Sequence, residues 1–299
     1  MRRHAMLLGV VLFVAGCSSG GEEGAPQADV SMYAGLGAWV DVYDYAPGFQ
    51  TDGTPPDVIP ETVDDMEALG VETLYLQAAF ADPAAPDDAV VDVDLVGDFL
   101  ERAHEHDIRV VAWYLPRLGD VDADLRLVEA LDEFEVDDQR FDSIALDIEW
   151  TADVPETTER NRRLVELSER SRQVVGDDAL GAIVLPPVQL EVVNPALWPE
   201  FPWRDLAPHY DVWLPMAYFT FRVGEHRDPA SYVGESVRRL RANVGDDDAS
   251  VHAIGGIADL TTSVDVEALQ RVVDDEELIG WSLYDYDTTL TPLWTRLRS

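Results

Sequence analysis

Two carboxylates stand two positions apart in the segment DSIALDIEW, residues 142–150. If this segment is a β-strand, Asp147 and Glu149 share one face, because strand side chains alternate between faces. Two carboxyl groups this close cannot both ionise freely, so the pKa of one is raised and that group can act as a general acid near neutral pH. The pair therefore predicts acid catalysis of the kind that glycoside cleavage needs. An ion pair with an arginine, or a solvated strand end, is the structural alternative.

The elements that must position this pair repeat along the chain. From Met32 onward, short apolar β-type runs alternate with amphipathic helical stretches, which predicts repeated βα units and a parallel sheet. The predicted strands are Gly37–Tyr43, Val71–Ala78, Ile108–Leu115, Ser143–Glu149, Leu180–Leu185, Val212–Tyr218, Val251–Gly255 and Leu278–Leu283. The predicted helices are Pro60–Leu69, Leu95–His106, Asp122–Phe134, Glu156–Val175, Trp203–Ala207, Pro229–Val244, Val264–Val273 and Pro292–Arg298.

Repeated βα units without a long linker predict one (β/α)8 TIM barrel over residues 31–299. No glycine-rich nucleotide-binding motif follows the first predicted strand, which disfavours an open nucleotide-binding sheet. Chemistry in such barrels lies at the carboxyl ends of the strands. At those ends the sequence places acids among aromatic residues, which is typical of a sugar groove, although half of these side chains would simply pack. They are Trp39, Asp41, Tyr43, Asp44, Gln77, Trp113, Tyr114, Tyr284, Asp285 and Asp287.

The segment from Asp142 to Glu149 resembles the fourth-strand signature of glycoside hydrolase family 18, the chitinase family, which reads Asp-x-x-Asp-x-Asp-x-Glu. Asp142, Asp147 and Glu149 match its first, third and fourth acidic positions, and Ala145 stands at the second. The resemblance implies that Glu149 donates the proton. It also implies that Asp147 orients the N-acetyl group of the substrate, which attacks the anomeric carbon as an internal nucleophile.

Two further motifs are similar to those of the family. Met216-Ala217-Tyr218 resembles its Met-x-Tyr motif, which implies that the Tyr218 hydroxyl hydrogen-bonds the acetamido group, although Phe219 stands where an Asp often follows. Gly280-Trp281-Ser282 resembles the segment whose Trp floors the subsite of the cleaved sugar. The absence of an Asp at Ala145 removes a group that shares a proton with its neighbour, so the resemblance leaves weakened, altered or lost activity open.

Two other interpretations remain. A retaining glycosidase with two protein carboxylates needs a second acid opposite Glu149, but the predicted seventh strand ends Ile254-Gly255-Gly256, with Asp259 the nearby acid. A non-catalytic carbohydrate-binding envelope lipoprotein that kept the barrel and lost the chemistry would accommodate Ala145. No cofactor is expected, and the six histidines form no close metal-ligand motif.

The amino-terminal segment predicts export and a lipid anchor. Arg2 and Arg3 precede an apolar run, and small residues precede Cys17, so residues 1–17 are typical of a secretory signal. The run Val14-Ala15-Gly16-Cys17 resembles a bacterial lipobox, and Cys17 is the only cysteine. Residues 18–30 are then typical of a flexible tether. We therefore expect an extracytoplasmic protein anchored in the cell membrane through Cys17.

The charge of the chain disfavours anionic partners. Its 59 acidic residues exceed its 21 basic residues, all arginine, and give a formal net charge of −38. The resulting field repels nucleic acids and anionic membrane surfaces. A glycan is therefore the expected partner, and the sequence does not indicate an oligomeric state.

Overall fold

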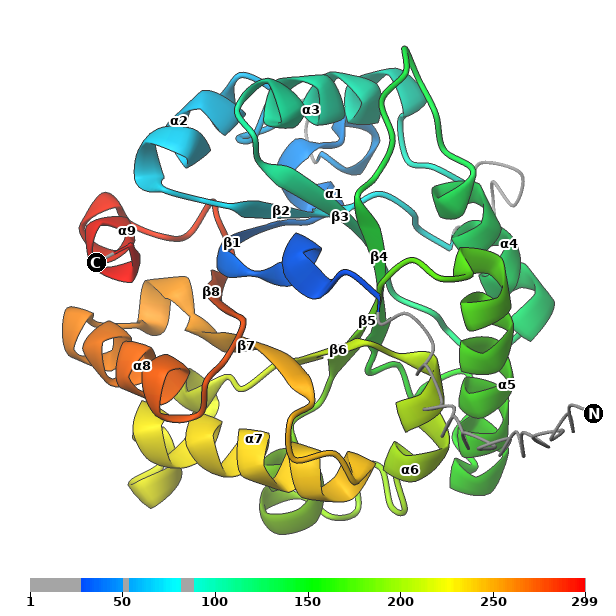
Figure 1. The fold of residues 1–299 in the computed structure, drawn as a ribbon, viewed down its shortest axis with the longest axis vertical. Coiled ribbons are helices and arrows are strands. Elements are labelled where there is room, and N and C mark those ends of the chain that lie inside the picture. The colour runs from blue at the N-terminus through cyan, green and yellow to red at the C-terminus, as the bar shows by residue number, and fades with distance from the viewer. Residues whose placement is uncertain (1–27, 51–53, 82–88, 299) are drawn as a thin grey trace, which may run out of the picture.

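The computed structural model describes residues 28–50, 54–81 and 89–298, and these form one closed barrel of parallel strands (Figure 1). Each strand pairs with the next along the chain, and the eighth pairs with the first. The prediction of a single-domain (β/α)8 TIM barrel is confirmed. The strands are β1 Gly35–Val40, β2 Thr73–Gln77, β3 Arg109–Tyr114, β4 Ser143–Ile148, β5 Leu180–Val184, β6 Val212–Pro215, β7 Ser250–Ile257 and β8 Gly280–Tyr284.

Helices surround the barrel, and acidic caps begin several of them. Carboxylate oxygens of Asp92, Asp120, Glu156 and Asp228 accept hydrogen bonds from backbone N–H groups of the first turn, where the helix dipole also favours negative charge. Part of the acidity of the chain is thus used in starting helices. The surrounding helices are α2 Thr62–Leu69, α3 Val93–Glu105, α4 Val121–Asp132, α5 Thr157–Val175, α6 Trp203–Leu206, α7 Pro229–Val244, α8 Ser263–Asp275 and α9 Thr291–Leu297.

Strand alternation divides the apolar residues into two cores. Side chains such as Leu74, Leu146 and Val184 point outward and pack against the helices. Those such as Tyr75, Val111 and Leu214 fill the inside of the barrel. The barrel is therefore packed at its centre, and a ligand can enter only at an end.

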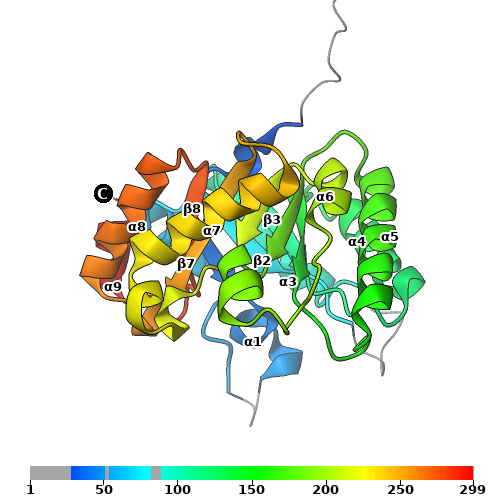
Figure 2. The same cartoon turned by 90° about the horizontal axis from the view of Figure 1, so that it is seen from below.

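Two strands end three residues earlier in the structure than the sequence predicts. The first is predicted to reach Tyr43, but β1 ends at Val40 because Asp41 caps the short helix α1 Val42–Tyr45 in a capping box with Asp44. The sixth is predicted to reach Tyr218, but β6 ends at Pro215. Both changes turn the chain across the carboxyl end of the barrel, and Figure 2 shows α1 beyond that end.

The described chain begins at the opposite end of the barrel (Figure 2). A short 3-10 helix, Val30–Tyr33, places Tyr33 inside, where its hydroxyl donates a 2.6 Å hydrogen bond to the backbone oxygen of Ile144. The predicted signal segment, Cys17 and the tether up to residue 27 lie outside the described residues. Within the described ranges, no helix is long and apolar enough to cross a bilayer.

Candidate active site

Asp147 and Glu149 lie at the carboxyl end of β4. The alternation predicted for this strand holds, because Ile144, Leu146 and Ile148 pack outward against the helices. Asp147 is inside the barrel with 7% of its surface exposed. Glu149 follows the strand directly and is exposed to solvent at the mouth. One acid is therefore embedded in the protein and the other reaches water, and both line the same two hollows.

The first hollow, which we call the inner hollow, encloses about 190 Å³ over the centre of the barrel. Its walls are mostly aromatic and aliphatic. Among the described residues, Asp147 and Glu149 are the carboxylates that line it. Such a lining suits the apolar face of a sugar ring with a few polar contacts. Besides the acids, it is lined by Trp39, Trp113, Ile183, Met216, Tyr218, Ile254, Ile257 and Tyr284.

The second hollow, the outer hollow, encloses about 290 Å³ above β1 to β4. Trp113, Tyr284 and the two acids line both hollows, so the acids stand at the boundary between them. Its own lining is more polar. It comprises Asp41, Tyr43, Gln77, Ala79, Phe80, Ala81, Tyr114, Leu115, Arg117 and Trp150.

The surroundings of the pair favour its protonated forms. Burial, followed by the charge of neighbouring Glu149, raises the pKa of Asp147 well above its ordinary value. The protein around the Glu149 carboxyl group also removes part of its hydration, although the side chain reaches solvent, and this raises the pKa of Glu149. The pKa of Tyr218 is raised first by burial and then by the charges of Asp147 and Glu149, so its hydroxyl stays protonated beside them. The site can thus hold a proton on a carboxyl group at a pH where an exposed carboxyl would be ionised.

A chain of buried hydrogen bonds fixes the floor of the inner hollow. Trp39 stacks on Tyr75 at 4.2 Å between ring centroids, and its Nε1 donates to Ser282 Oγ at 2.8 Å. Ser282 Oγ in turn lies 3.0 Å from Nε2 of His252, whose Nδ1 lies 2.8 Å from the backbone oxygen of Tyr33. These partners assign His252 as neutral with its proton on Nδ1, and burial lowers its pKa to about 4.

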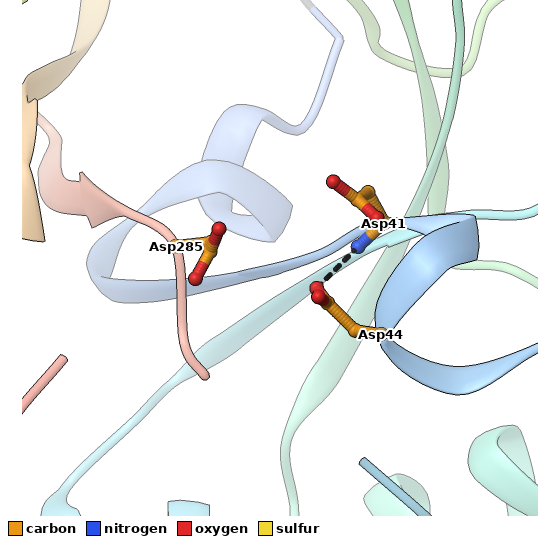
Figure 3. Close-up of side chains that lie close together, drawn as sticks. All are labelled: Asp41, Asp44 and Asp285. Atoms are coloured by element: carbon orange, nitrogen blue, oxygen red, sulfur yellow. Dashed lines mark hydrogen bonds between the residues drawn. The ribbon is translucent and has the colours of Figure 1, made fainter. Parts of the chain in front are cut away.

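Three acids from opposite ends of the sequence meet beside the outer hollow (Figure 3). Oxygens of Asp41, Asp44 and Asp285 lie within 4.8 Å of one another, because β8 pairs with β1 in the closed barrel. Burial, followed by the charge of Asp41, raises the pKa of Asp44 to about 7. Carboxylate oxygens suit hard cations such as Ca²⁺ or Mg²⁺. Here, however, each acid already accepts a hydrogen bond that shapes its own loop, from the backbone N–H of Tyr43, Asp41 and Thr288 respectively.

Comparison with known proteins identifies the fold. The sequence matches no protein-family model and no curated protein. The spore cortex-lytic enzyme SleL of Bacillus megaterium superposes with a TM-score of 0.60 at 10% identity, covering 88% of this chain and 73% of SleL. A class V chitinase of Pseudomonas fluorescens gives 0.60 at 9% identity over 89% of this chain and 99% of the chitinase. GH5_18 of Streptomyces cattleya, solved in complex with GlcNAc, gives 0.60 at 13% identity over 89% and 79%. This chain therefore has a glycoside hydrolase-like TIM-barrel fold.

Of the residues predicted for the site, most lie at the two hollows. Trp39, Met216 and Tyr218 line the inner one. Asp41 and Gln77 line the outer one, and Trp113 lines both. Gln77 Oε1 also accepts a hydrogen bond of 3.1 Å from the backbone N–H of Val42, which holds α1 over the outer hollow. Asp285 lies beside this hollow in the acid cluster.

Two predicted site residues point their polar groups away from the hollows. Trp281 faces the helices, where its Nε1 donates to the backbone oxygen of Leu297 at 3.0 Å, so it cannot floor a subsite. Its neighbour Ser282 faces inward instead. Tyr114 contributes to the wall of the outer hollow, but its hydroxyl points outward to Asp124 Oδ1.

Asp142 precedes β4 at the opposite end of the barrel from Glu149. Its Oδ2 accepts a hydrogen bond of 2.6 Å from the backbone N–H of Val110 and lies 3.2 Å from Nε2 of His104. Asp142 therefore joins β3 to β4 and is not among the residues that line the hollows. The match of Asp142 to the first acidic position of the family 18 signature therefore does not bring it to the hollows, because the 6 residues of β4 separate it from Glu149.

Several lining residues were not predicted from the sequence. Ile183, Ile254 and Ile257 complete the inner wall, and their apolar types carry no signal that separates a wall from a core. Trp150 and Arg117 line the outer hollow, with the Arg117 guanidinium carbon 4.5 Å from the centroid of the Trp150 ring. Trp150 directly follows Glu149, so its position after the fourth strand could have identified it.

Proposed function

We propose that this protein is a glycoside hydrolase that cleaves N-acetylhexosamine-containing glycans by substrate-assisted hydrolysis with retention of configuration. The observation that carries the proposal is the place of Asp147 and Glu149 at the boundary of two adjoining hollows, under conditions that raise the pKa of both. A glycosidic bond lying over this boundary would have one sugar in each hollow. The resemblance of residues 142–149 to the family 18 signature supports the same assignment.

In this mechanism Glu149 is the general acid and base. The acetamido oxygen of the sugar in the inner hollow attacks its own anomeric carbon while the bond to the leaving oxygen breaks, and Glu149 gives that oxygen its proton. Water then enters, Glu149 takes a proton from it, and the resulting hydroxide attacks the same carbon, which reopens the ring formed by the acetamido group. The solvent exposure of Glu149 suits both the departure of the first product and the arrival of water.

Asp147 and Tyr218 would position the acetamido group. The positive charge that develops on the cyclised acetamido group favours the ionised form of Asp147, which accepts the amide N–H and stabilises that charge. The Tyr218 hydroxyl donates to the acetamido oxygen. Trp39 and Trp113, rather than Trp281, provide the aromatic surface on which the ring lies.

The lining of the inner hollow favours substrate assistance over a two-carboxylate mechanism. Opposite the acids, β7 contributes Ile254 and Ile257, and Asp259 is not among the lining residues. Among the described residues that line the inner hollow, no carboxylate besides Asp147 and Glu149 of the same strand end is present, so none faces Glu149 from the opposite side as a nucleophile.

A second candidate is a carbohydrate-binding protein without catalysis, and Ala145 is the observation that favours it. Ala145 lies in the inner core with no exposed surface, at the position where the family signature has an acid. Asp147 accordingly lacks the carboxyl neighbour with which it would share a proton. The two candidates make opposite predictions for turnover and the same prediction for binding.

Hydrolysis of a chromogenic N-acetylglucosaminide separates them. We expect the wild type to release the chromophore, the Glu149→Gln variant to release none, and NMR to show the first-formed product with the anomeric configuration of the substrate. If wild type and variant are equally inactive while both bind N-acetylglucosamine oligomers, the binding protein is the correct interpretation.

We further propose that the protein is extracytoplasmic and anchored in the membrane by a lipid on Cys17. This rests on the lipobox-like segment of the sequence alone. Metabolic labelling with radioactive palmitate tests it, because a Cys17→Ser variant should lose the label and partition into the aqueous phase of a detergent extract. Label retained in that variant would contradict the anchor.

A further inference from the structure

Two tryptophans line the inner hollow, and their indole N–H groups differ. Trp39 Nε1 donates to Ser282 Oγ at 2.8 Å. Trp113 is 5% exposed, and its buried Nε1 has no acceptor among the described residues. The hydrogen bond that fixes one indole is thus missing for the other, although their rings are only 6.1 Å apart.

An unpaired acceptor lies on the neighbouring strand. Trp113 on β3 is the register partner of Ala145 on β4, and Asp147 is the next inward-facing residue of β4. The Asp147 Oδ1 atom is buried and, like the Trp113 N–H, has no partner within the described ranges. Because the Ala145 side chain ends at its methyl group, it offers neither of them a polar partner. A free donor and a free acceptor therefore occupy adjacent strands at the boundary of the two hollows.

Such pairs are rare in protein interiors. Leaving a buried polar group without a hydrogen bond costs about 1–3 kcal/mol, and most buried polar groups have partners. A phenylalanine would supply an aromatic ring at position 113, smaller than the indole but without this cost. In empty sites the polar groups that bind the substrate are often poorly aligned and form their bonds only in the complex.

We propose that Trp113 is a substrate-binding residue that selects the N-acetyl group, its indole N–H donating to the acetamido oxygen while Asp147 accepts the amide N–H. This rests on the proposed function in placing an amino sugar in the inner hollow. A secondary amide offers one acceptor and one donor, which complements the free pair, and its oxygen has a second lone pair for Tyr218. A free ammonium group offers donors only and leaves the Trp113 N–H unpaired.

Binding of two trisaccharides tests the assignment without requiring turnover. Calorimetry compares the trimer of N-acetylglucosamine with the fully deacetylated trimer of glucosamine, in about 1 M salt to shorten the Debye length to about 3 Å and suppress general attraction of the cation to this acidic protein. Trp113→Phe removes part of the ring surface that both trimers contact, so the ratio of the two affinities is the readout. We expect this variant to lower the affinity for the acetylated trimer relative to that for the deacetylated trimer by about ten-fold or more.

Trp39→Phe is the matched control. It removes an indole N–H that already has a protein partner, so we expect its melting temperature to fall and its ratio of affinities for the two trimers to stay as in the wild type. Trp113→Phe removes the same indole volume but no hydrogen bond, so its melting temperature should fall less than that of Trp39→Phe. In the wild type, the side-chain ¹⁵N–¹H resonance that is absent from Trp113→Phe should shift when the acetylated trimer is added.

Several results would overturn the inference. They are equal weakening of both trimers by Trp113→Phe, unchanged binding of the acetylated trimer, or a melting temperature that falls as far as that of Trp39→Phe or further. Failure of the wild type to bind the acetylated trimer would overturn both this inference and the proposed function. Selective binding that depends on Trp113 without any hydrolysis would support the inference and contradict the proposed function alone.

Discussion

The hydroxyl of Tyr284 donates a 2.9 Å hydrogen bond to Oδ2 of Asp41. Tyr284 lines both hollows and Asp41 caps α1, so this bond joins the end of β8 to the turn after β1. Because the acceptor is a partly buried carboxylate, we expect Tyr284→Phe to lower the free energy of unfolding by about 1–2 kcal/mol in urea titrations. Tyr43→Phe is the control, since the Tyr43 side chain is exposed. Equal effects of the two changes would contradict the structural importance of the bond.

Asp44 should make stability depend on pH near neutrality. Its folded pKa of about 7 exceeds the value of about 4 expected in the unfolded chain. A carboxyl group with a raised folded pKa contributes stability that is present at pH 4 and is lost as pH rises to 7 and above. We therefore expect the free energy of unfolding of Asp44→Asn to equal that of the wild type near pH 4. At pH 8 it should exceed the wild-type value by about 1–2 kcal/mol, allowing for solvent screening.

The amide oxygen that this variant carries at position 44 can still accept the hydrogen bond from the backbone N–H of Asp41, so the cap survives the change. Urea unfolding at the two pH values measures the difference, with Asp247→Asn on the exposed surface as the control. A gain that is the same at pH 4 and pH 8 would show that the titration of Asp44 is not its cause.

The repeat of βα units was predictable because burial on both faces gives each parallel strand a short apolar run, and this signal recurs around the barrel. The inward direction of Asp147 was predictable for the related reason that its aliphatic neighbours on β4 must meet the helices. The closeness of Asp41 and Asp285 followed only from closure of the barrel, which brings β8 beside β1.

Trp281 shows why the rest could not be predicted. A tryptophan packs equally well inside the barrel or under a helix. Its residue type therefore does not decide which residues of the strand face inward and which face outward. The decisive residue is Gly280, where a Cβ atom would lie 2.2 Å from Nδ1 of His252. Gly280 and Ser282 face inward to make room for that ring, which turns Trp281 outward. This contact is between residues of β7 and β8, so it cannot be predicted from the sequence of β8 alone.

Glu149→Gln should separate catalysis from stability. The pKa of Glu149 is raised in the folded protein, so its ionised form lowers stability as pH rises, and an uncharged amide removes that loss. We expect turnover of the chromogenic N-acetylglucosaminide to fall below detection while the melting temperature at pH 8 stays the same or increases. The control is Glu225→Gln, an exposed residue outside both hollows. A large fall in the melting temperature of Glu149→Gln would mean that Glu149 has a structural role.

His252 should give the opposite pH dependence from Asp44. Its folded pKa of about 4 lies below the value of about 6.5 in the unfolded chain, so its contribution is present above pH 6.5 and is lost as pH falls to 4. This difference between the two pKa values corresponds to about 3 kcal/mol in the free energy of unfolding. His252→Asn cannot titrate, and it leaves Ser282 without its acceptor, so we expect the variant to be about 1–3 kcal/mol less stable at pH 7.

As pH falls from 6.5 to 4, the wild type should lose stability that the His252→Asn variant keeps, and the difference between them should shrink toward zero or change sign. Urea unfolding of both proteins across this range measures it. Fluorescence of Trp39, which depends on the same hydrogen-bond chain, should change only near pH 4, where His252 of the folded wild type takes up its proton, and not in the variant. A difference in stability that stays constant from pH 7 to pH 4 would mean that His252 has the same pKa in the folded barrel as in the unfolded chain. The buried contacts with Tyr33 and Ser282 would then not hold the ring in its neutral form.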